Sequence, residues 1–182
     1  MKKPSNFDVF SETTLIISKP RVINGNLYVK GDLQFKNAAR LEVHGNVIVD
    51  GDILDGSIIS HGNLKCINLC NMNTEVDGNI HISNDADFLT LKSNNGHITI
   101  NGSASGMRLK ALGGSIEIGE SADLTYIMAF DEINIEENII AKNIIAGNGL
   151  NVGDSIINSA YYSNMKISIL NGGLHSKNLK IN

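Results

Sequence analysis

The sequence repeats one hydrophobic pattern about every 17 residues, and this repeat constrains the fold more than any other feature. Pairs of apolar residues separated by one position recur, with 16 to 20 residues between their first members. Each pair predicts a short strand with one buried face. The pairs are Leu27/Val29, Val47/Val49, Leu64/Cys66, Ile80/Ile82, Ile98/Ile100, Ile116/Ile118, Ile133/Ile135, Leu150/Val152 and Ile167/Ile169.

We call a position that recurs once in every repeat a column, so the two members of each pair form the first and second columns. Two further apolar columns keep the same spacing. The third column follows each pair by four residues, and comprises Leu33, Ile53, Cys70, Ala86, Ala104, Ala122, Ile139 and Ile156. The fourth column follows five residues later, and comprises Ile58, Leu91, Leu109, Ile127, Ile144 and Tyr161. The regular spacing indicates that every repeat buries the same positions.

The polar residues between these columns also repeat. A glycine precedes most first pairs (Gly25, Gly45, Gly62, Gly78, Gly96 and Gly114), and an asparagine follows the first four of these glycines. Glycine and asparagine tolerate the left-handed backbone that tight turns use. Corners every five or six residues exclude long strands and helices.

Stacked turns and short strands have one compact solution, a single-stranded parallel β-helix, or β-solenoid. We expect an all-β fold of about nine coils of 16–20 residues. At about 4.8 Å per coil, the rod would be roughly 43 Å long. We assign residues 22–182 to the solenoid domain and residues 1–21 to an N-terminal cap segment.

Composition excludes several classes of protein. The chain has 182 residues, 42% hydrophobic and 19% charged, which is the composition of a folded domain. Two cysteines exclude a disulfide framework. The apolar runs fall far short of the roughly 20 residues of a membrane span. No apolar run follows Lys2 and Lys3, so the start does not predict a secretory signal, and we expect a cytoplasmic protein.

Two segments, Gly25–Leu33 and Gly45–Ile53, carry a resemblance to a known family. Both follow the pattern Gly-Asn, alternating apolar residues, Gly-Asp and a further aliphatic residue. This resembles the bactofilins, bacterial polymer-forming proteins with a right-handed β-helix core. The resemblance covers roughly residues 22–182, and it lies in the order and spacing of the repeated residue types. It implies a right-handed helix and head-to-tail filaments that form without nucleotide, often at a membrane.

The search for chemistry predicts no catalytic, cofactor-binding or metal-binding residues. His44, His61 and Asp77 occupy one column, and two histidines with a carboxylate are a possible ligand set. The repeat alone creates such columns, so we interpret them as a solvated stack. Cys66 and Cys70 fall on inward columns and are interpreted as small core residues.

Two classes of enzyme are built on β-helices. Hexapeptide acyltransferases have coils near 18 residues, but they resemble strict repeats of six with a loop that carries a catalytic histidine. Pectin-degrading enzymes use longer coils with long loops that build a cleft. No insertion here exceeds three residues. We therefore expect a protein that is not an enzyme.

Charge is unevenly distributed. Residues 1–40 carry seven basic and three acidic side chains, whereas residues 111–141 carry seven acidic side chains and no Lys or Arg. An acidic belt of this kind steers partners. Nucleic acid is not an expected partner, because no basic stripe is interleaved with aromatic residues. Membrane association is possible but has no signal in the sequence.

The outward columns turn apolar toward the C-terminus, which predicts an interface. We expect two apolar ladders side by side in the last coils, followed by an open final coil. The expected interface residues are Met128, Ile145 and Tyr162 in one ladder, Ile140 and Ile157 in the other, and Leu179 and Ile181 at the open end.

The leading hypothesis is a structural scaffold that self-assembles, or binds another protein, through these faces or its C-terminal end. The alternative is an acidic phage- or pathogen-derived inhibitor or effector that binds a host protein. A hexapeptide-type acyltransferase is the second alternative.

Overall fold

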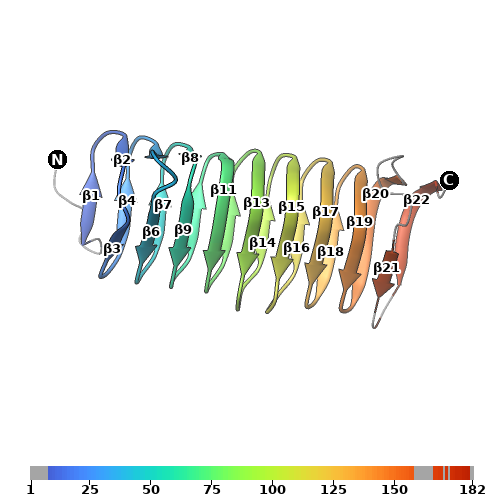
Figure 1. The fold of residues 1–182 in the computed structure, drawn as a ribbon. Helices are drawn as coiled ribbons and strands as arrows, with labels where there is room; N and C mark the ends of the chain where they lie inside the picture. The colour runs from blue at the N-terminus through green and yellow to red at the C-terminus, as the bar shows by residue number, and fades with distance from the viewer. Residues whose placement is uncertain (1–7, 158–165, 170, 172, 181–182) are drawn as a thin grey trace.

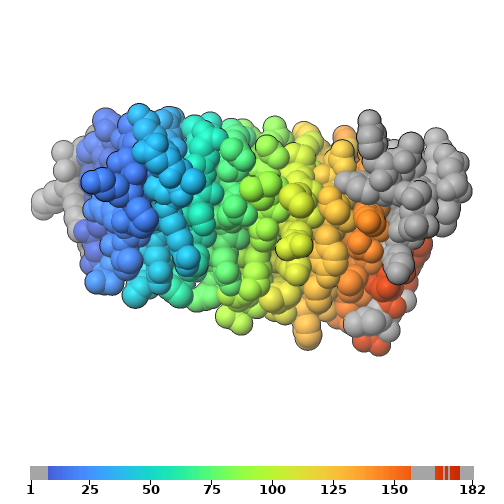
Figure 2. Space-filling model, in the orientation of Figure 1, coloured from blue at the N-terminus to red at the C-terminus, as the bar shows by residue number. Residues whose placement is uncertain are grey.

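The computed structural model describes residues 8–157, 166–169, 171 and 173–180. In these residues the chain forms strands and turns, with no helix, and therefore no helix that could cross a bilayer. The strands wind into a rod of stacked coils, with β1 and β22 at opposite ends (Figure 1). Successive coils form successive bands along the rod (Figure 2). The predicted all-β solenoid is confirmed, and the number of coils is close to the nine expected.

Each coil contributes strands to three faces, and each strand pairs in parallel with its equivalents in neighbouring coils. Face 1 contains β1 (Val9–Ser11), β4 (Leu27–Val29), β7 (Val47–Val49), β10 (Leu64–Cys66), β12 (Ile80–Ile82), β14 (Ile98–Ile100), β16 (Ile116–Ile118), β18 (Glu132–Ile135) and the first parts of β20 (Gly149–Ile157) and β22 (Leu174–Lys180). Face 2 begins with β2 (Leu15–Ile17), β5 (Leu33–Phe35) and β8 (Ile53–Leu54). Face 3 begins with β3 (Arg21–Ile23), β6 (Arg40–Val43) and β9 (Ser57–Ser60), and ends with β21 (Lys166–Ile169).

In the middle of the rod, one long strand supplies both face 2 and face 3. These strands are β11 (Leu69–Val76), β13 (Ala86–Ser93), β15 (Ala104–Ala111), β17 (Ala122–Ala129) and β19 (Ile139–Ala146). In β17 the alternation of buried and outward residues breaks at Thr125 and Tyr126, which both face outward between buried Leu124 and Ile127. Two consecutive outward residues turn the chain, so a corner lies inside the strand.

The predicted register holds through most of the rod. Leu27 pairs with Val47, Val47 with Leu64, and Leu64 with Ile80. These side chains are essentially fully buried and belong to one continuous hydrophobic core. The core is the interior of the rod, so each coil is stabilised chiefly by its neighbours.

One assignment in the third column is wrong. Leu69, not Cys70, pairs with Ile53 and is fully buried, while Cys70 is half-buried on the outward side. Asn71 has a φ of 54°, and the pairing of β11 with β13 shifts on both sides of Met72. The inward position moves to Leu69 because the chain from Cys66 to Leu69 is one residue shorter than the paired segment from Ile82 to Ala86. The irregularity that follows places Met72 in the core.

The expected N-terminal cap is itself a coil. Strands β1, β2 and β3 pair with β4, β5 and β6 in the register of the later coils, and Ile17 and Ile23 are buried. The solenoid therefore begins by Val9, before the boundary expected at residue 22. The residues before Asp8 lie outside the described part of the chain.

The last coil also differs from the prediction. Ile167 and Ile169 pair with Ile144 and Ala146 on face 3, not with the first-pair column on face 1. Leu179 pairs with Ile156, which places it in the third column and not the fourth. The repeat lengthens after Ile157, so the constant spacing assumed from the sequence no longer applies. Tyr161 lies outside the described residues.

Candidate interaction surface

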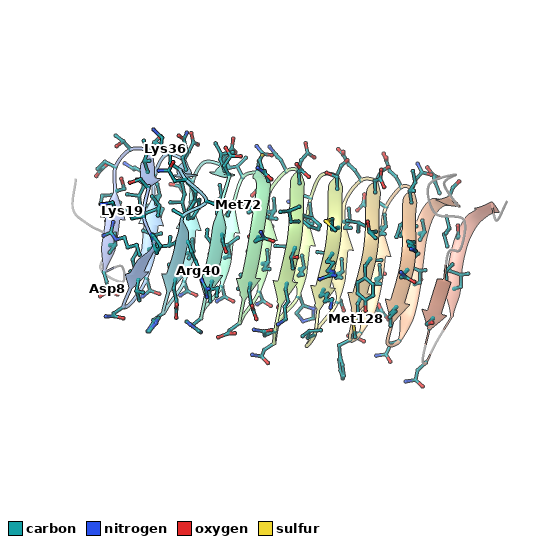
Figure 3. All side chains as sticks on the ribbon, viewed as in Figure 1. Asp8, Lys19, Lys36, Arg40, Met72 and Met128 are labelled. Carbon is teal, nitrogen blue, oxygen red and sulfur yellow. The ribbon has the colours of Figure 1, made fainter. Side chains whose placement is uncertain are left out.

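The central outward column of face 3 contains two of the expected interface residues. Met128 pairs with Ile145, and both side chains are half-buried. The next residue in this column is Ser168, because Ile145 pairs with it. Tyr162 and Ile181 lie outside the described residues. Figure 3 labels Met128 among the side chains that project from the C-terminal half of the rod.

The most exposed apolar side chain beside this column was missed by the sequence analysis. Phe130 directly follows β17 and is 67% exposed. Leu112, at the equivalent position after β15, is 38% exposed. Each directly follows the end of a face-3 strand, at the corner between faces 3 and 1. Ala111 pairs with Ala129, so Leu112 and Phe130 occupy equivalent positions in consecutive coils. The sequence pattern could have identified both residues. Each directly follows a small inward residue, Ala111 or Ala129, so its own side chain is expected to face outward.

Aromatic and cationic groups join this apolar surface. The Lys110 ammonium lies 5.1 Å from the ring centroid of Tyr126, a cation–π contact, and the Tyr126 hydroxyl donates to Met128 Sδ at 3.3 Å. Arg108 is exposed and pairs with Tyr126. We call the apolar and aromatic part of this surface the face-3 patch, and it comprises Met107, Leu112, Tyr126, Met128, Phe130 and Ile145.

The second predicted ladder does not lie beside the first. Ile140 pairs with Asp123 and Ile157 on face 2. On β19 the outward residues Lys142 and Asn143 form the corner that separates Ile140 from Ile145. The expectation of two adjacent apolar ladders is therefore wrong, because the chain turns between them.

A shallow groove of about 730 Å³ runs along face 2. Its lining is small and polar, with Ala86, Ala104 and Ala122 between rows of Asp, Ser and Asn side chains, and with Cys70 and Ile140 among the other residues. Burial raises the pKa of the Cys70 thiol, and nearby carboxylates, Asp52 foremost, raise it further. The thiol is therefore protonated near neutral pH and is a weak nucleophile.

A group of acidic side chains lies on sides of the rod away from the face-3 patch. Glu117 projects from face 1, Glu120 and Glu137 stack at the corner between faces 1 and 2, and all three are exposed. We call this surface the acidic edge, which comprises Glu117, Glu120, Asp123, Glu136 and Glu137. Five of the seven acidic residues in the segment 111–141 therefore lie away from the patch, whereas Asp131 and Glu132 directly follow Phe130.

Several basic residues lie near the N-terminal end of the rod. Lys19, Lys36 and Arg40 all lie in the N-terminal part of the rod (Figure 3), and all three side chains are exposed. At the C-terminal end, β22 pairs only with β20 among the described strands, and Leu174 is 38% exposed. The expected end residue Leu179 lies on β22.

The predicted stack of histidines forms at the corner between faces 3 and 1. The ring centroids of His44 and His61 are 5.2 Å apart, with the rings nearly perpendicular. Asp77 follows in the next coil and contacts His61. This corner is therefore polar in its N-terminal half and apolar at Leu112 and Phe130.

Comparisons with protein-family models, with curated proteins and with solved structures each found no match to this chain.

Proposed function

We propose that this protein is a rigid, non-enzymatic scaffold that self-associates laterally, with the face-3 patch of one copy against the acidic edge of another. The observation that carries the proposal is the exposure of Phe130, at 67%, beside Leu112 at the corner that borders face 3. The proposal places the protein in the cytoplasm, where its two free thiols stay reduced.

The composition of the patch supports an interface. Protein–protein interfaces are enriched in aromatic residues, Met and Arg, and their strongest contacts are buried aromatic side chains near the centre. Tyr126, Met128, Phe130 and Arg108 provide these residue types on adjacent positions. A contiguous exposed apolar surface costs free energy in water, which burial against another molecule recovers.

Charge complementarity favours a second copy as the occupant. Arg108 and Lys110 accompany the patch, whereas the acidic edge presents exposed carboxylates from the same coils on other sides of the rod. A contact between two different surfaces of identical chains is heterologous, so it extends into an open polymer unless the rotation closes a ring. The filaments implied by the resemblance to bactofilins would be one form of such an assembly.

The first test is sedimentation velocity over a range of protein concentrations and salt. Wild-type protein should form species larger than a monomer, and they should weaken as salt screens the charged contacts. Phe130→Ser should be monomeric with an unchanged circular dichroism spectrum, because the side chain is exposed. Ile67→Ser, which removes an exposed apolar residue elsewhere, should assemble like the wild type. A wild type that remains monomeric throughout would overturn the proposal.

A mixing experiment tests whether the contact joins two different surfaces. Phe130→Ser keeps the acidic edge, and the double variant Glu117→Lys/Glu136→Lys keeps the patch. Each should be monomeric alone, whereas an equimolar mixture should form a dimer that grows no further. Polymers formed by either variant alone would contradict the heterologous arrangement.

A further inference from the structure

The N-terminal half of the corner between faces 3 and 1 holds a compact group of nitrogen and oxygen ligands. His44 directly follows β6, and His61 directly follows β9. Val43 pairs with Ser60, so the two imidazoles project from consecutive coils at the same corner. Glu42, two residues before His44, projects from face 3 toward them. The ligand atoms of these three side chains all lie within 4.8 Å of one another.

The distances suit a tetrahedral metal ion. Glu42 Oε1 lies 3.3 Å from Nε2 of His44 and 3.3 Å from Nε2 of His61. Two ligands at about 2.0–2.1 Å from a Zn²⁺ ion, separated by a tetrahedral angle, are about 3.4 Å apart. The carboxylate oxygen therefore already has the spacing from each imidazole nitrogen that shared coordination requires.

A carboxylate supports His61 from the other side of the ring. His61 Nδ1 lies 2.8 Å from Asp77 Oδ2, and Asn94 Nδ2 donates to Asp77 Oδ1 at 2.8 Å. An ionised carboxylate only accepts hydrogen bonds, so a metal-bound His61 would keep its proton on Nδ1, donated to Asp77, and would offer the Nε2 lone pair to the ion in place of a hydrogen bond to Glu42. Metal-binding histidines almost always donate their second ring N–H to such a partner.

We propose that Glu42, His44 and His61 form a binding site for a transition-metal ion of the Zn²⁺ class, with Asp77 as the residue that positions His61. Two imidazole ligands favour Zn²⁺, Co²⁺, Ni²⁺ or Cu²⁺ over Ca²⁺ and Mg²⁺, which prefer oxygen. The side chains of His44 and His61 are 49% and 43% exposed, so solvent reaches the ion and supplies the remaining position.

The site would join two coils of the rod. Its ligands lie in β6 or directly after β6 and β9, so a bound ion would cross-link neighbouring coils near the N-terminal end. Ligands that bind only the folded chain raise its stability by mass action. The metal would therefore act as a structural clamp on coils that are otherwise held by strand pairing and core packing.

Titration of untagged full-length protein with Co²⁺, followed by Zn²⁺ competition, tests the site directly. The wild type should develop the intense visible absorption of tetrahedral Co²⁺, and Zn²⁺ should abolish it. His44→Ala, His61→Ala and Glu42→Gln should each weaken binding at least tenfold. Asp77→Asn should weaken it 10- to 100-fold through loss of the positioning contact. Ca²⁺ should not compete.

His81→Ala is the matched control, because His81 is a half-buried histidine on face 1, outside this group. It should bind Co²⁺ like the wild type. Circular dichroism in EDTA should show that the four exposed or half-exposed site variants remain folded. Equal Co²⁺ binding by His61→Ala and wild type, or no binding by the wild type at millimolar Co²⁺, would overturn the proposal.

Discussion

Asn46 accepts two hydrogen bonds from Asn63 in the next coil: its Oδ1 lies 2.8 Å from the backbone nitrogen and 3.1 Å from Nδ2 of Asn63. Asn26 accepts the same pair of bonds from Asn46, and Asn63 accepts from the backbone of Asn79. Each side chain therefore satisfies a backbone N–H that the corner would otherwise leave without a partner. Repeated amide ladders of this kind also stabilise cross-β assemblies.

Replacing one member of the ladder should destabilise the rod. Asn46→Ala removes the acceptor for the backbone N–H of Asn63, which should lower the free energy of unfolding by about 1–3 kcal/mol. Urea denaturation followed by circular dichroism measures the change. Asn73→Ala, at an exposed position on β11, serves as the control and should change stability by less than about 0.5 kcal/mol. Equal stabilities for the two variants would show that the ladder contributes nothing.

The glycines beside the ladder are required by close approach of the next coil. A Cβ atom at Gly62 would lie 2.6 Å from Asn46 Oδ1 and 2.7 Å from the backbone of Gly45. Gly62→Ala should therefore destabilise by about 1–3 kcal/mol, because the backbone must shift. At Gly149 the nearest atom to an added Cβ is 3.7 Å away. Gly149→Ala should be neutral or slightly stabilising, and thermal melting of both variants provides the comparison.

Thr74 is a buried polar residue in an otherwise apolar column. It pairs with Ile58 and Leu91 and is 2% exposed, and its hydroxyl has no hydrogen-bond partner among the described residues. Thr74→Val keeps the shape and removes the unsatisfied group, so it should raise the free energy of unfolding by about 1 kcal/mol. Thr90→Val, at an outward position on β13, should leave stability nearly unchanged. Destabilisation by Thr74→Val would indicate that the hydroxyl is satisfied.

The histidine corner should make stability depend on pH in a defined direction. The hydrogen bond to Asp77, and then that to Glu42, raises the pKa of His61 above its ordinary value. The hydrogen bond with Asn94, and then that with His61, lowers the pKa of Asp77. A raised histidine pKa contributes stability that is complete below about pH 6.5 and is lost as pH rises through the folded-state pKa. The carboxylate's contribution is lost only as pH falls through its own lowered value.

The difference in unfolding free energy between wild type and His61→Gln, measured in EDTA, should therefore be larger near pH 5.5 than near pH 8.5. NMR titration should give His61 a higher midpoint than His61 has in Asp77→Asn. A midpoint for His61 below about 6.5 would contradict the assignment of these contacts.

The sequence was sufficient for the stack itself. The apolar period and the Gly–Asn corners encode which residues lie above one another, because every coil must meet identical strand and turn requirements. Leu27, Val47 and Leu64 stack as the spacing predicts. The prediction was wrong at Cys70, because the preceding corner is one residue shorter, and at Ile167, because the last coil is longer.

The sites depended on geometry that no period encodes. The corner inside β19 arises where two consecutive side chains face outward, and no glycine marks it, so the sequence placed Ile140 and Ile145 on one surface. The approach of Glu42 to both His44 and His61 depends on side-chain directions across a corner. Repetition determines which backbones stack, because strand pairing acts between equivalent residues. Contacts between different columns depend on how sharply each corner turns, which only the folded coil determines.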